Sequence, residues 1–163
     1  MKIIRNAIVF LLISAVLFTA VGCSKDYSVS NFTVLNKELE EVEFYDLIGK
    51  PIVLNFWATW CYYCKVEMPA FDEACRENPD ILFVMVNHTD GVNETVEKAY
   101  AYVIASGYSF PIYYDVNLEA ADAYGVDAFP TTFFISADGE VVRSHEGAMD
   151  KDTLDGYIRL LKK

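Results

Sequence analysis

An apolar run that leads directly into a pair of cysteines constrains this sequence more than any other feature. Residues 52–57 read Ile-Val-Leu-Asn-Phe-Trp, and Cys61 and Cys64 follow shortly afterwards. A nearly continuous run of this kind is typical of a central strand that is buried on both faces, as in parallel pairing. From Cys61 to Glu77 apolar residues recur at three- and four-residue spacing, which predicts a helix that Pro69 kinks. We therefore expect a buried strand that ends where a helix begins, with both cysteines in the first helical turn.

The rest of the sequence continues this alternation of strands and helices. Further strands are predicted at residues 32–35, 42–44, 81–86, 110–114, 131–135 and 140–144. Further helices are predicted at residues 93–106, 118–124 and 152–161. The Asp138-Gly139 pair between the last two strands is a hairpin signal. This order predicts an α/β domain with a mixed central sheet that is flanked by helices.

The spacing of the two cysteines favours redox chemistry. Residues three apart lie on one face of a first helical turn, so a bond between the two sulfurs can form and break with little backbone movement. Unpaired N–H groups and the helix dipole at that end favour negative charge, and we expect them to lower the pKa of the first thiol. We therefore predict that Cys61 is the nucleophile and that Cys64 is the resolving thiol.

A zinc site is the alternative for a pair of this spacing, and a closed structural site needs four ligands. The remaining candidates are Cys75, His88 and His145. Cys75 would lie about 21 Å from Cys61 along a helix that rises 1.5 Å per residue, too far to share one site. We therefore expect no metal and no cofactor, with Cys75 as a helix-face thiol and the two histidines in a loop or at a strand end.

The N-terminus predicts export. Lys2 and Arg5 precede an apolar run at residues 7–20. This run is shorter than the roughly 20 residues that span a membrane comfortably, and it has the length of a signal-peptide core. Small residues then precede Cys23, an arrangement that resembles the lipobox of bacterial lipoproteins, although Ala20 stands where that pattern usually has Leu. A lipoprotein is expected, and an uncleaved N-terminal anchor is the alternative; both place the domain outside the cytoplasm.

These signals divide the chain into three parts. Residues 1–22 are predicted as a signal peptide, residues 23–30 as a tether with a lipidated cysteine, and residues 31–163 as one folded domain. Loss of the first part removes two basic residues and changes the formal net charge from −11 to −13. Such an acidic domain lacks the basic surface that binds nucleic-acid phosphates or anionic lipid headgroups. Membrane attachment would therefore come from the anchor.

Several motifs together resemble the TlpA/ResA-like branch of the thioredoxin superfamily. They are residues 56–69 (FWATWCYYCKVEMP), residues 124–126 (YGV), residues 129–135 (FPTTFFI) and the hairpin that ends at residues 146–147. Their order and spacing match the family along the mature chain. Residues 92–115 resemble the helix-and-strand insertion that separates this branch from minimal thioredoxin. The resemblance implies a thioredoxin fold with this insertion before the cis-proline strand, and a membrane-tethered, extracytoplasmic protein that acts on disulfides.

The resemblance also implies a substrate-binding edge. Pro130 corresponds to the cis-proline that faces the dithiol, and the backbone of Phe129 would pair with a bound peptide. An ordinary trans proline in a turn is the alternative. Trp60, which stands directly before the first cysteine, is the third expected substrate-binding residue.

Two positions depart from the family pattern. Asn55 stands where thioredoxins carry a buried Asp, and an amide cannot exchange a proton. Glu67 is therefore the expected proton partner of Cys64, because it lies three residues further along the same helical face. Partial burial would raise the pKa of Glu67 and suit it to acid–base work, whereas a solvated glutamate is the alternative. The second departure is Tyr62-Tyr63 between the cysteines, which leaves the redox potential and the direction of electron flow open.

We predict from these features an extracytoplasmic thiol:disulfide oxidoreductase that reduces disulfides in exported proteins and contributes to redox homeostasis. Apocytochrome c is one substrate known for the family, a membrane electron donor would recharge the dithiol, and a monomer is expected. A thiol oxidase or isomerase on the same site is the alternative. Two further alternatives are a thiol peroxidase and a non-catalytic partner-binding lipoprotein. A thiol peroxidase would need a lone cysteine in a Pro-x-x-x-Thr-x-x-Cys setting, whereas Cys61 is followed by Cys64. A non-catalytic lipoprotein would be expected to have lost one of these two cysteines.

Overall fold

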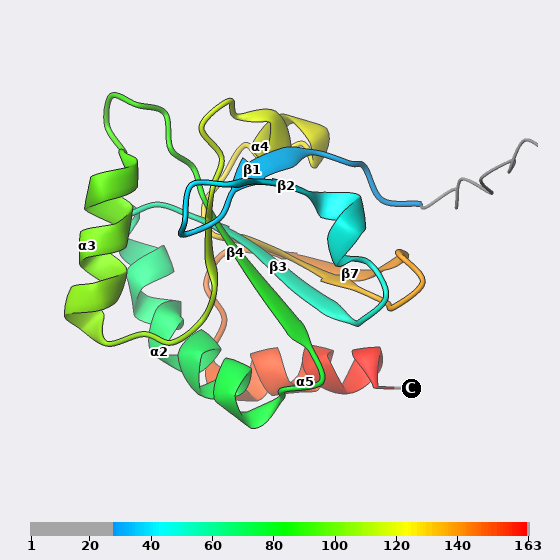
Figure 1. Ribbon diagram of the computed structural model, residues 1–163. Coiled ribbons are helices and arrows are strands. Elements are labelled where there is room, and N and C mark those ends of the chain that lie inside the picture. Colours follow the sequence, from blue (N-terminus) through cyan, green and yellow to red (C-terminus); the bar gives the residue numbers. More distant parts are fainter. Residues whose placement is uncertain (1–27, 163) are drawn as a thin grey trace, which may run out of the picture.

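A seven-stranded mixed sheet, in the order β2-β1-β5-β4-β3-β6-β7, organises the computed structural model, which describes residues 28–162 (Figure 1). The predicted signal peptide and Cys23 lie outside the described residues. Between residues 28 and 162 no helix combines the length and the apolar character needed to cross a membrane. The described chain packs against the domain from its start, because Val29 is buried and Ser28 Oγ donates a hydrogen bond to the carbonyl of Gly139 at 2.9 Å.

The strands are β1 (Thr33–Leu35), β2 (Glu41–Glu43), β3 (Ile52–Trp57), β4 (Leu82–Asn87), β5 (Ile112–Tyr114), β6 (Thr131–Ile135) and β7 (Val141–Glu146). The three central strands β3, β4 and β5 run parallel to one another. β6 and β7 extend the sheet on one side by antiparallel pairing, and β1 and β2 do so on the other. The predicted mixed sheet is therefore confirmed.

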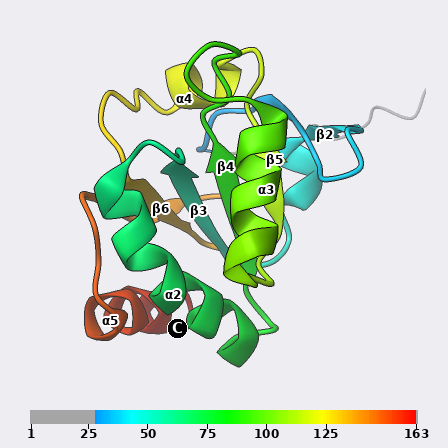
Figure 2. The same cartoon turned by 90° about the vertical axis from the view of Figure 1, so that its left-hand side faces the viewer.

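The helices are α2 (Tyr62–Glu77), α3 (Val96–Ser106), α4 (Glu119–Ala123) and α5 (Lys151–Leu161), and a 3-10 helix η1 spans Phe44–Leu47. α2, α3 and α5 cover one face of the sheet, and α4 and η1 lie on the other face (Figures 1 and 2). The segment from α3 to β5 forms the helix-and-strand insertion that the sequence predicts.

β3 has the bounds predicted from its apolar run, and every one of its residues is buried. Because side chains alternate along a strand, Val53, Asn55 and Trp57 face the helices α2, α3 and α5. Ile52, Leu54 and Phe56 point into the second core under α4. The carboxyl end of β3 leads into α2, and ligands of open α/β sheets bind at such ends.

Several element boundaries differ from the predictions by a few residues, and for two of them the structure shows a local reason. The second strand ends at Glu43, because Phe44 begins a 3-10 turn that places its ring, fully buried, in the second core. The helix of the insertion begins at Val96 rather than at residue 93. Thr95 caps it by accepting a hydrogen bond from the Lys98 N–H at 3.3 Å, and the preceding residues form a loop around Asp90. α2 continues through Pro69 as one helix.

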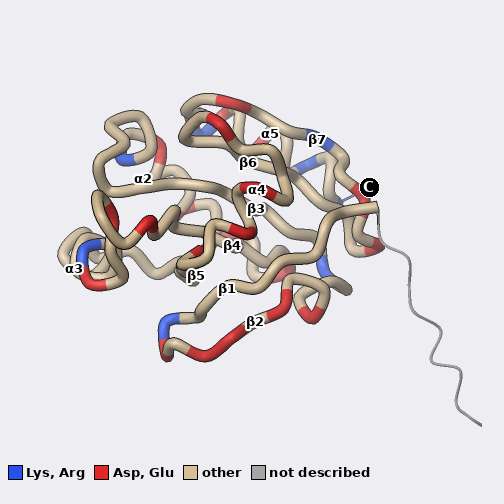
Figure 3. The backbone as a smooth tube through the Cα atoms, turned by 90° about the horizontal axis from the view of Figure 1, so that it is seen from above, with Lys and Arg blue, Asp and Glu red and all other residues tan. Residues whose placement is uncertain are grey.

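Acidic residues predominate along the described backbone, as the net charge of −11 requires (Figure 3). Red segments occur on both sheet edges and on the helices, and the blue segments lie scattered among them.

Candidate active site

A disulfide between Cys61 and Cys64 lies at the N-terminus of α2, directly after β3. Cys61 is the N-cap residue of the helix, and its sulfur accepts a hydrogen bond from the Cys64 N–H at 3.0 Å. The Cα atoms of the two cysteines are 5.3 Å apart. The sulfur of Cys61 therefore occupies the position where a helix N-terminus stabilises negative charge, as the cysteine spacing predicted.

The two sulfur-bearing residues differ in exposure. Cys61 retains 6% of its surface exposed, whereas Cys64 is completely buried. Cys61 is therefore the more accessible of the two cysteines. This order agrees with the predicted roles of attacking and resolving cysteine.

Glu67 lies one turn further along α2 and is 98% buried, with 2% of its surface exposed. One carboxylate oxygen, Oε1, accepts a hydrogen bond from Asn55 Nδ2 at 2.8 Å, and the other, Oε2, accepts one from the Met149 N–H at 3.0 Å. Asn55 Nδ2 also donates to Thr132 Oγ1 at 2.9 Å. The carboxyl group is thus held directly by Asn55 on β3 and by the loop that precedes α5. Asn55 is in turn hydrogen-bonded to Thr132 on β6.

Burial raises the pKa of Glu67 from its ordinary value of 4.5 to about 7. The hydrogen bonds from Met149 and Asn55 stabilise the carboxylate and act in the opposite direction, but they offset only part of the cost of removing the charge from water. A carboxyl group with this pKa can take up and release a proton near neutral pH. Of the two sequence expectations for Glu67, the structure therefore shows the buried glutamate and not the solvated one.

The Phe129–Pro130 peptide bond is cis, as the family resemblance implied. The carbonyl of Pro130 accepts a hydrogen bond from the Gly147 N–H at 2.8 Å. The ring of Phe129 contacts the ring of Trp60 edge-on at 5.7 Å between centroids. The segment before β6 is therefore brought against the residue that precedes the disulfide.

His88 also belongs to this neighbourhood, which the sequence did not indicate. It follows β4 directly, and its ring lies 5.0 Å from that of Phe129. Its Nδ1 atom is buried and has no hydrogen-bond partner within the described part of the chain. No spacing relates residues 88 and 129, so their contact becomes visible only in the folded sheet.

Glu94 is a second buried carboxylate near the site that sequence reasoning missed. It accepts hydrogen bonds from the backbone N–H of Thr59 at 3.2 Å, from Thr59 Oγ1 at 2.6 Å and from Asn87 Nδ2 at 2.9 Å. Thr59 lies in the short connection between β3 and α2. Glu94 therefore ties the segment that leads into Cys61 to the insertion, although its surroundings in the sequence are those of an ordinary polar loop.

The other residues that the sequence analysis considered as possible metal ligands do not belong to this group. Cys75 is a half-buried free thiol, and burial raises its pKa. His145 lies on β7, with its ring 5.8 Å from that of Tyr157. Within residues 28–162 no cluster of three or more histidine, cysteine, aspartate or glutamate side chains has the arrangement of a metal site.

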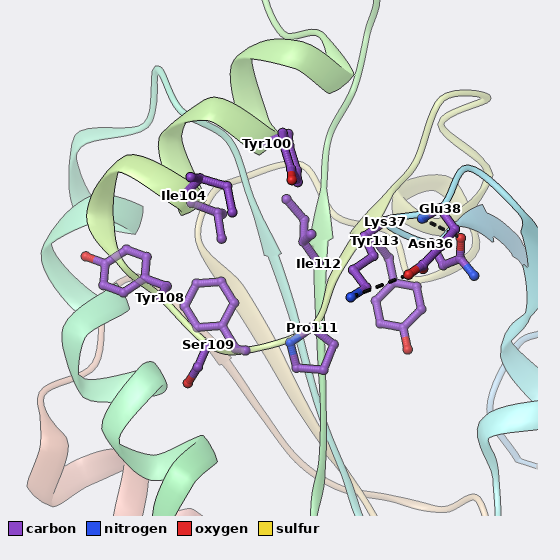
Figure 4. Close-up of a pocket in the computed structure, with 12 residues that line it drawn as sticks. Asn36, Lys37, Glu38, Tyr100, Ile104, Tyr108, Ser109, Pro111, Ile112 and Tyr113 are labelled. Atoms are coloured by element: carbon purple, nitrogen blue, oxygen red, sulfur yellow. Dashed lines mark hydrogen bonds and ion pairs between the residues drawn. The ribbon is translucent and has the colours of Figure 1, made fainter.

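A groove of about 450 Å³ lies between α3, β5 and the turn after β1 (Figure 4). Its walls are largely aromatic and aliphatic, with Tyr100, Ile104, Tyr108 and Tyr113 among the lining residues. Neither cysteine of the disulfide lines it. The candidate reaction centre is therefore the disulfide at the end of β3 and not this groove.

The chain has clear relatives among known proteins. A model of the AhpC/TSA family matches residues 26–144. The thiol-disulfide oxidoreductase ResA of Oceanobacillus iheyensis is 34% identical over 170 residues, which cover 96% of this chain and 86% of that protein. ResA of Bacillus subtilis is 32% identical over 170 residues, which cover 98% and 92% of the two chains.

Solved structures agree with this relationship. A secreted disulfide oxidoreductase of Mycobacterium tuberculosis superimposes with a TM-score of 0.71 at 27% identity, covering 80% of this chain and 96% of that one. The exposed lipoprotein thioredoxin Etrx1 of Streptococcus pneumoniae gives 0.68 at 28% identity, covering 82% and 98%.

The sheet, the cis-proline and the dithiol at a helix N-terminus define a thioredoxin-fold thiol:disulfide oxidoreductase. More particularly, the chain belongs to the AhpC/TSA family, and within it to the ResA-type thiol-disulfide oxidoreductases.

Proposed function

We propose that this protein reduces disulfides in exported polypeptides, with Cys61 as the attacking thiolate and Cys64 as the resolving thiol. The observation that carries the proposal is that Cys61 keeps a small exposed surface of 6%, whereas Cys64 has none. In the reduced protein, the Cys61 thiolate attacks one sulfur of the substrate disulfide, and the other substrate sulfur leaves and takes up a proton. Cys64 then loses its proton and attacks the Cys61 sulfur, which releases the second substrate thiol. Two electrons pass to the substrate, and the disulfide of the protein forms again.

Trp60, Phe129 and Pro130 are the proposed substrate-binding residues. Trp60 is 52% exposed and stands beside Cys61, in contact with the Phe129 ring. Among the described residues, nothing forms a hydrogen bond with the N–H or C=O group of Phe129. An extended peptide could therefore pair with the Phe129 backbone, as peptides do when they add to a sheet edge.

Glu67 is the proposed proton partner of Cys64. Cys64 must lose a proton to act as the resolving nucleophile, and it is enclosed away from water. Glu67 is buried three residues further along the same helix, and its pKa of about 7 supports uptake of that proton at neutral pH.

The direction of electron flow is tested by the reduction potential of the purified protein against a glutathione buffer. A potential of about −250 mV or lower supports a reductant, whereas about −120 mV would identify the oxidase or isomerase alternative.

Insulin reduction provides the second test. Cys61→Ala should abolish it, and persistent activity in that variant would contradict the mechanism.

We further propose that residues 1–22 form a signal peptide and that Cys23 carries a lipid which holds the domain at the extracytoplasmic face of a bacterial membrane. The relatives include a protein described as an exposed lipoprotein and another described as secreted, which supports this assignment. Cys23→Ser should move the protein from the membrane fraction to the soluble fraction. Retention in the membrane fraction would favour the uncleaved anchor instead.

The proposed partners are disulfide-containing exported proteins, with apocytochrome c as a candidate, and a membrane electron donor that returns the dithiol to its reduced form. The domain is proposed to act as a monomer without a cofactor. Trapping with Cys64→Ser in cells would leave the substrate attached to Cys61 as a mixed disulfide, and its identity could be read by mass spectrometry.

A further inference from the structure

The side of β5 that faces away from β4 is only partly covered by β1. Tyr114 pairs with Leu35, the last residue of β1, and the described chain contains no other register pair between these two strands. After Leu35 the chain turns away from β5, because the Asn36 N–H donates to the carbonyl of Glu40 at 2.9 Å and closes a turn. The part of β5 that precedes Tyr114 therefore has no neighbouring strand on this side.

This gap leaves the backbone of Ile112 without a hydrogen-bond partner. The Met85 N–H donates to the carbonyl of Pro111 at 3.4 Å, so Pro111 faces β4 and the next residue, Ile112, faces away from it. Within residues 28–162 neither the N–H nor the C=O group of Ile112 forms a hydrogen bond. Only 5% of Ile112 is exposed, and backbone groups buried to this degree are almost always paired. The unpaired groups therefore call for a partner from outside the described chain.

The groove of Figure 4 lies at this gap. Ile112 lines it together with Val103 from the core under the helices and Tyr113 from the core on the other face of the sheet. Tyr100 and Ile104 on α3 also line it, and they remain 48% and 60% exposed (Figure 4). A hollow that both faces of a sheet line, beside an unpaired stretch of strand, has the position of a missing strand. Its volume of about 450 Å³ is that of an ordinary ligand pocket.

The segment that leads into β5 is already fixed in place. The N–H and the hydroxyl of Ser109 both donate to Asp72 Oδ1 on α2, at 2.6 Å and 2.9 Å. The ring of Phe110 stacks on that of Tyr108 at 5.1 Å between centroids. A partner that binds here does not have to order this wall of the groove, which lowers the entropic cost of binding.

The turn on the far side of the groove is negatively charged. Between β1 and β2 it carries three exposed glutamates, Glu38, Glu40 and Glu41, against one lysine, Lys37 (Figure 3). Lys37 is itself paired with Glu38 at 3.4 Å. Charge complementarity therefore favours a partner with basic side chains beside the groove.

We propose that the open edge of β5 binds an extended segment of a partner polypeptide, with aliphatic or aromatic residues at alternate positions and Lys or Arg at its ends. The segment runs antiparallel to β5, in line with β1, and its residue opposite Ile112 exchanges two backbone hydrogen bonds with it. The apolar side chains of the segment lie on the face of Tyr100 and Ile104, and the intervening ones lie on the face of Tyr113. Because neither cysteine of the disulfide lines the groove, this binding site does not rest on the proposed function.

The probe is the acetylated and amidated peptide Lys-Val-Thr-Val-Thr-Val-Lys, titrated into the purified, ¹⁵N-labelled full chain. The amide signal of Ile112 should shift in a saturable way and show a nuclear Overhauser effect to an amide of the peptide. N-methylation of two valine amides, which point towards β5, should abolish binding. N-methylation of the two threonine amides, which point away from β5, is the matched control and should leave binding in place.

Variants of the protein locate the site. Ile104→Ser should raise the Kd of the peptide by about fivefold, because the exposed part of one aliphatic side chain is no longer buried on binding. Val142→Ser is the matched control, since Val142 is 43% exposed on β7, the strand at the other end of the sheet order. It should keep the wild-type Kd. A peptide with Glu in place of both terminal Lys residues should bind at least about threefold more weakly at low ionic strength.

Three results would overturn the proposal. If the Ile112 amide does not respond to millimolar peptide, water alone pairs with it. If both methylated peptides bind equally well, the contact does not involve strand pairing. If the Ile112 signal shifts with protein concentration in the absence of peptide, the groove belongs to a second copy of this chain. Insulin reduction is measured in the same samples and should not change with the peptide, so the proposed function is judged separately.

Discussion

At Glu67, burial and hydrogen bonding act on one carboxyl group in opposite directions, and burial dominates. Because the pKa lies near 7, Glu67→Gln should remove a proton acceptor that works at physiological pH. We expect peptide-disulfide exchange at pH 7 to slow by at least about tenfold and the inflection near neutral pH to disappear. Rates measured from pH 5 to 9 would show this. Glu73→Gln, on the exposed side of the same helix, should retain the wild-type profile. An unaltered profile in Glu67→Gln would contradict the proton-transfer role.

Between elements, the Glu94 carboxylate connects the loop that precedes α3 to the short segment between β3 and α2. Its three hydrogen bonds come from donors only, so the amide of Glu94→Gln would place an N–H against another N–H. We expect the free energy of unfolding to fall by about 1–3 kcal/mol and disulfide exchange to slow, because Cys61 follows the loosened segment. Chemical denaturation measures the first effect.

Glu97→Gln, at an exposed position on the first turn of α3, is the control and should leave the free energy of unfolding close to that of the wild type. Equal stability of the two variants would show that the Glu94 hydrogen bonds do not hold this segment in place.

For the whole molecule, stability should decline as the solution passes from mildly acidic to neutral pH. The pKa of Glu67 is raised from 4.5 to about 7, so the folded disulfide form binds more protons than the unfolded chain in this window. Its favourable contribution is complete below about pH 4.5 and is lost above about pH 7, a change of about 3 kcal/mol. Burial also raises the pKa of Asp115, which acts in the same direction.

Below about pH 4 the dependence of stability on pH has the opposite sign. Hydrogen bonds from Ser109 and Arg76 hold the pKa of Asp72 below its ordinary value, so the stability that Asp72 contributes is lost as the pH falls below about 4. Denaturant unfolding from pH 3 to pH 9 should therefore show a maximum at mildly acidic pH. Glu67→Gln should flatten the fall in stability between about pH 4.5 and pH 7, and a slope that survives the substitution would assign it to other groups.

Much of the fold could be predicted from the sequence because its signals are local. The apolar run of β3, the helical period of α2 and the Asp138-Gly139 hairpin each report on a few neighbouring residues, and each matches the structure. The same holds for the dithiol, since the cysteine spacing and the position before a helix are properties of one segment. Boundaries were less predictable where a buried ring or a capping side chain decided them, as at Phe44 and Thr95.

By itself the sequence determined the class of fold and the position of the dithiol at the start of a helix. Only the tertiary structure decided which groups surround them. Glu67 meets Asn55 and Met149 across 12 and 82 residues of chain, Asn55 meets Thr132 across 77, and Thr59 meets Glu94 across 35. Such contacts depend on which strands become neighbours in the sheet and on which face each side chain points to. The surroundings of Glu67 and the buried hydrogen-bond network of the site are therefore consequences of topology, whereas the dithiol is a consequence of local spacing.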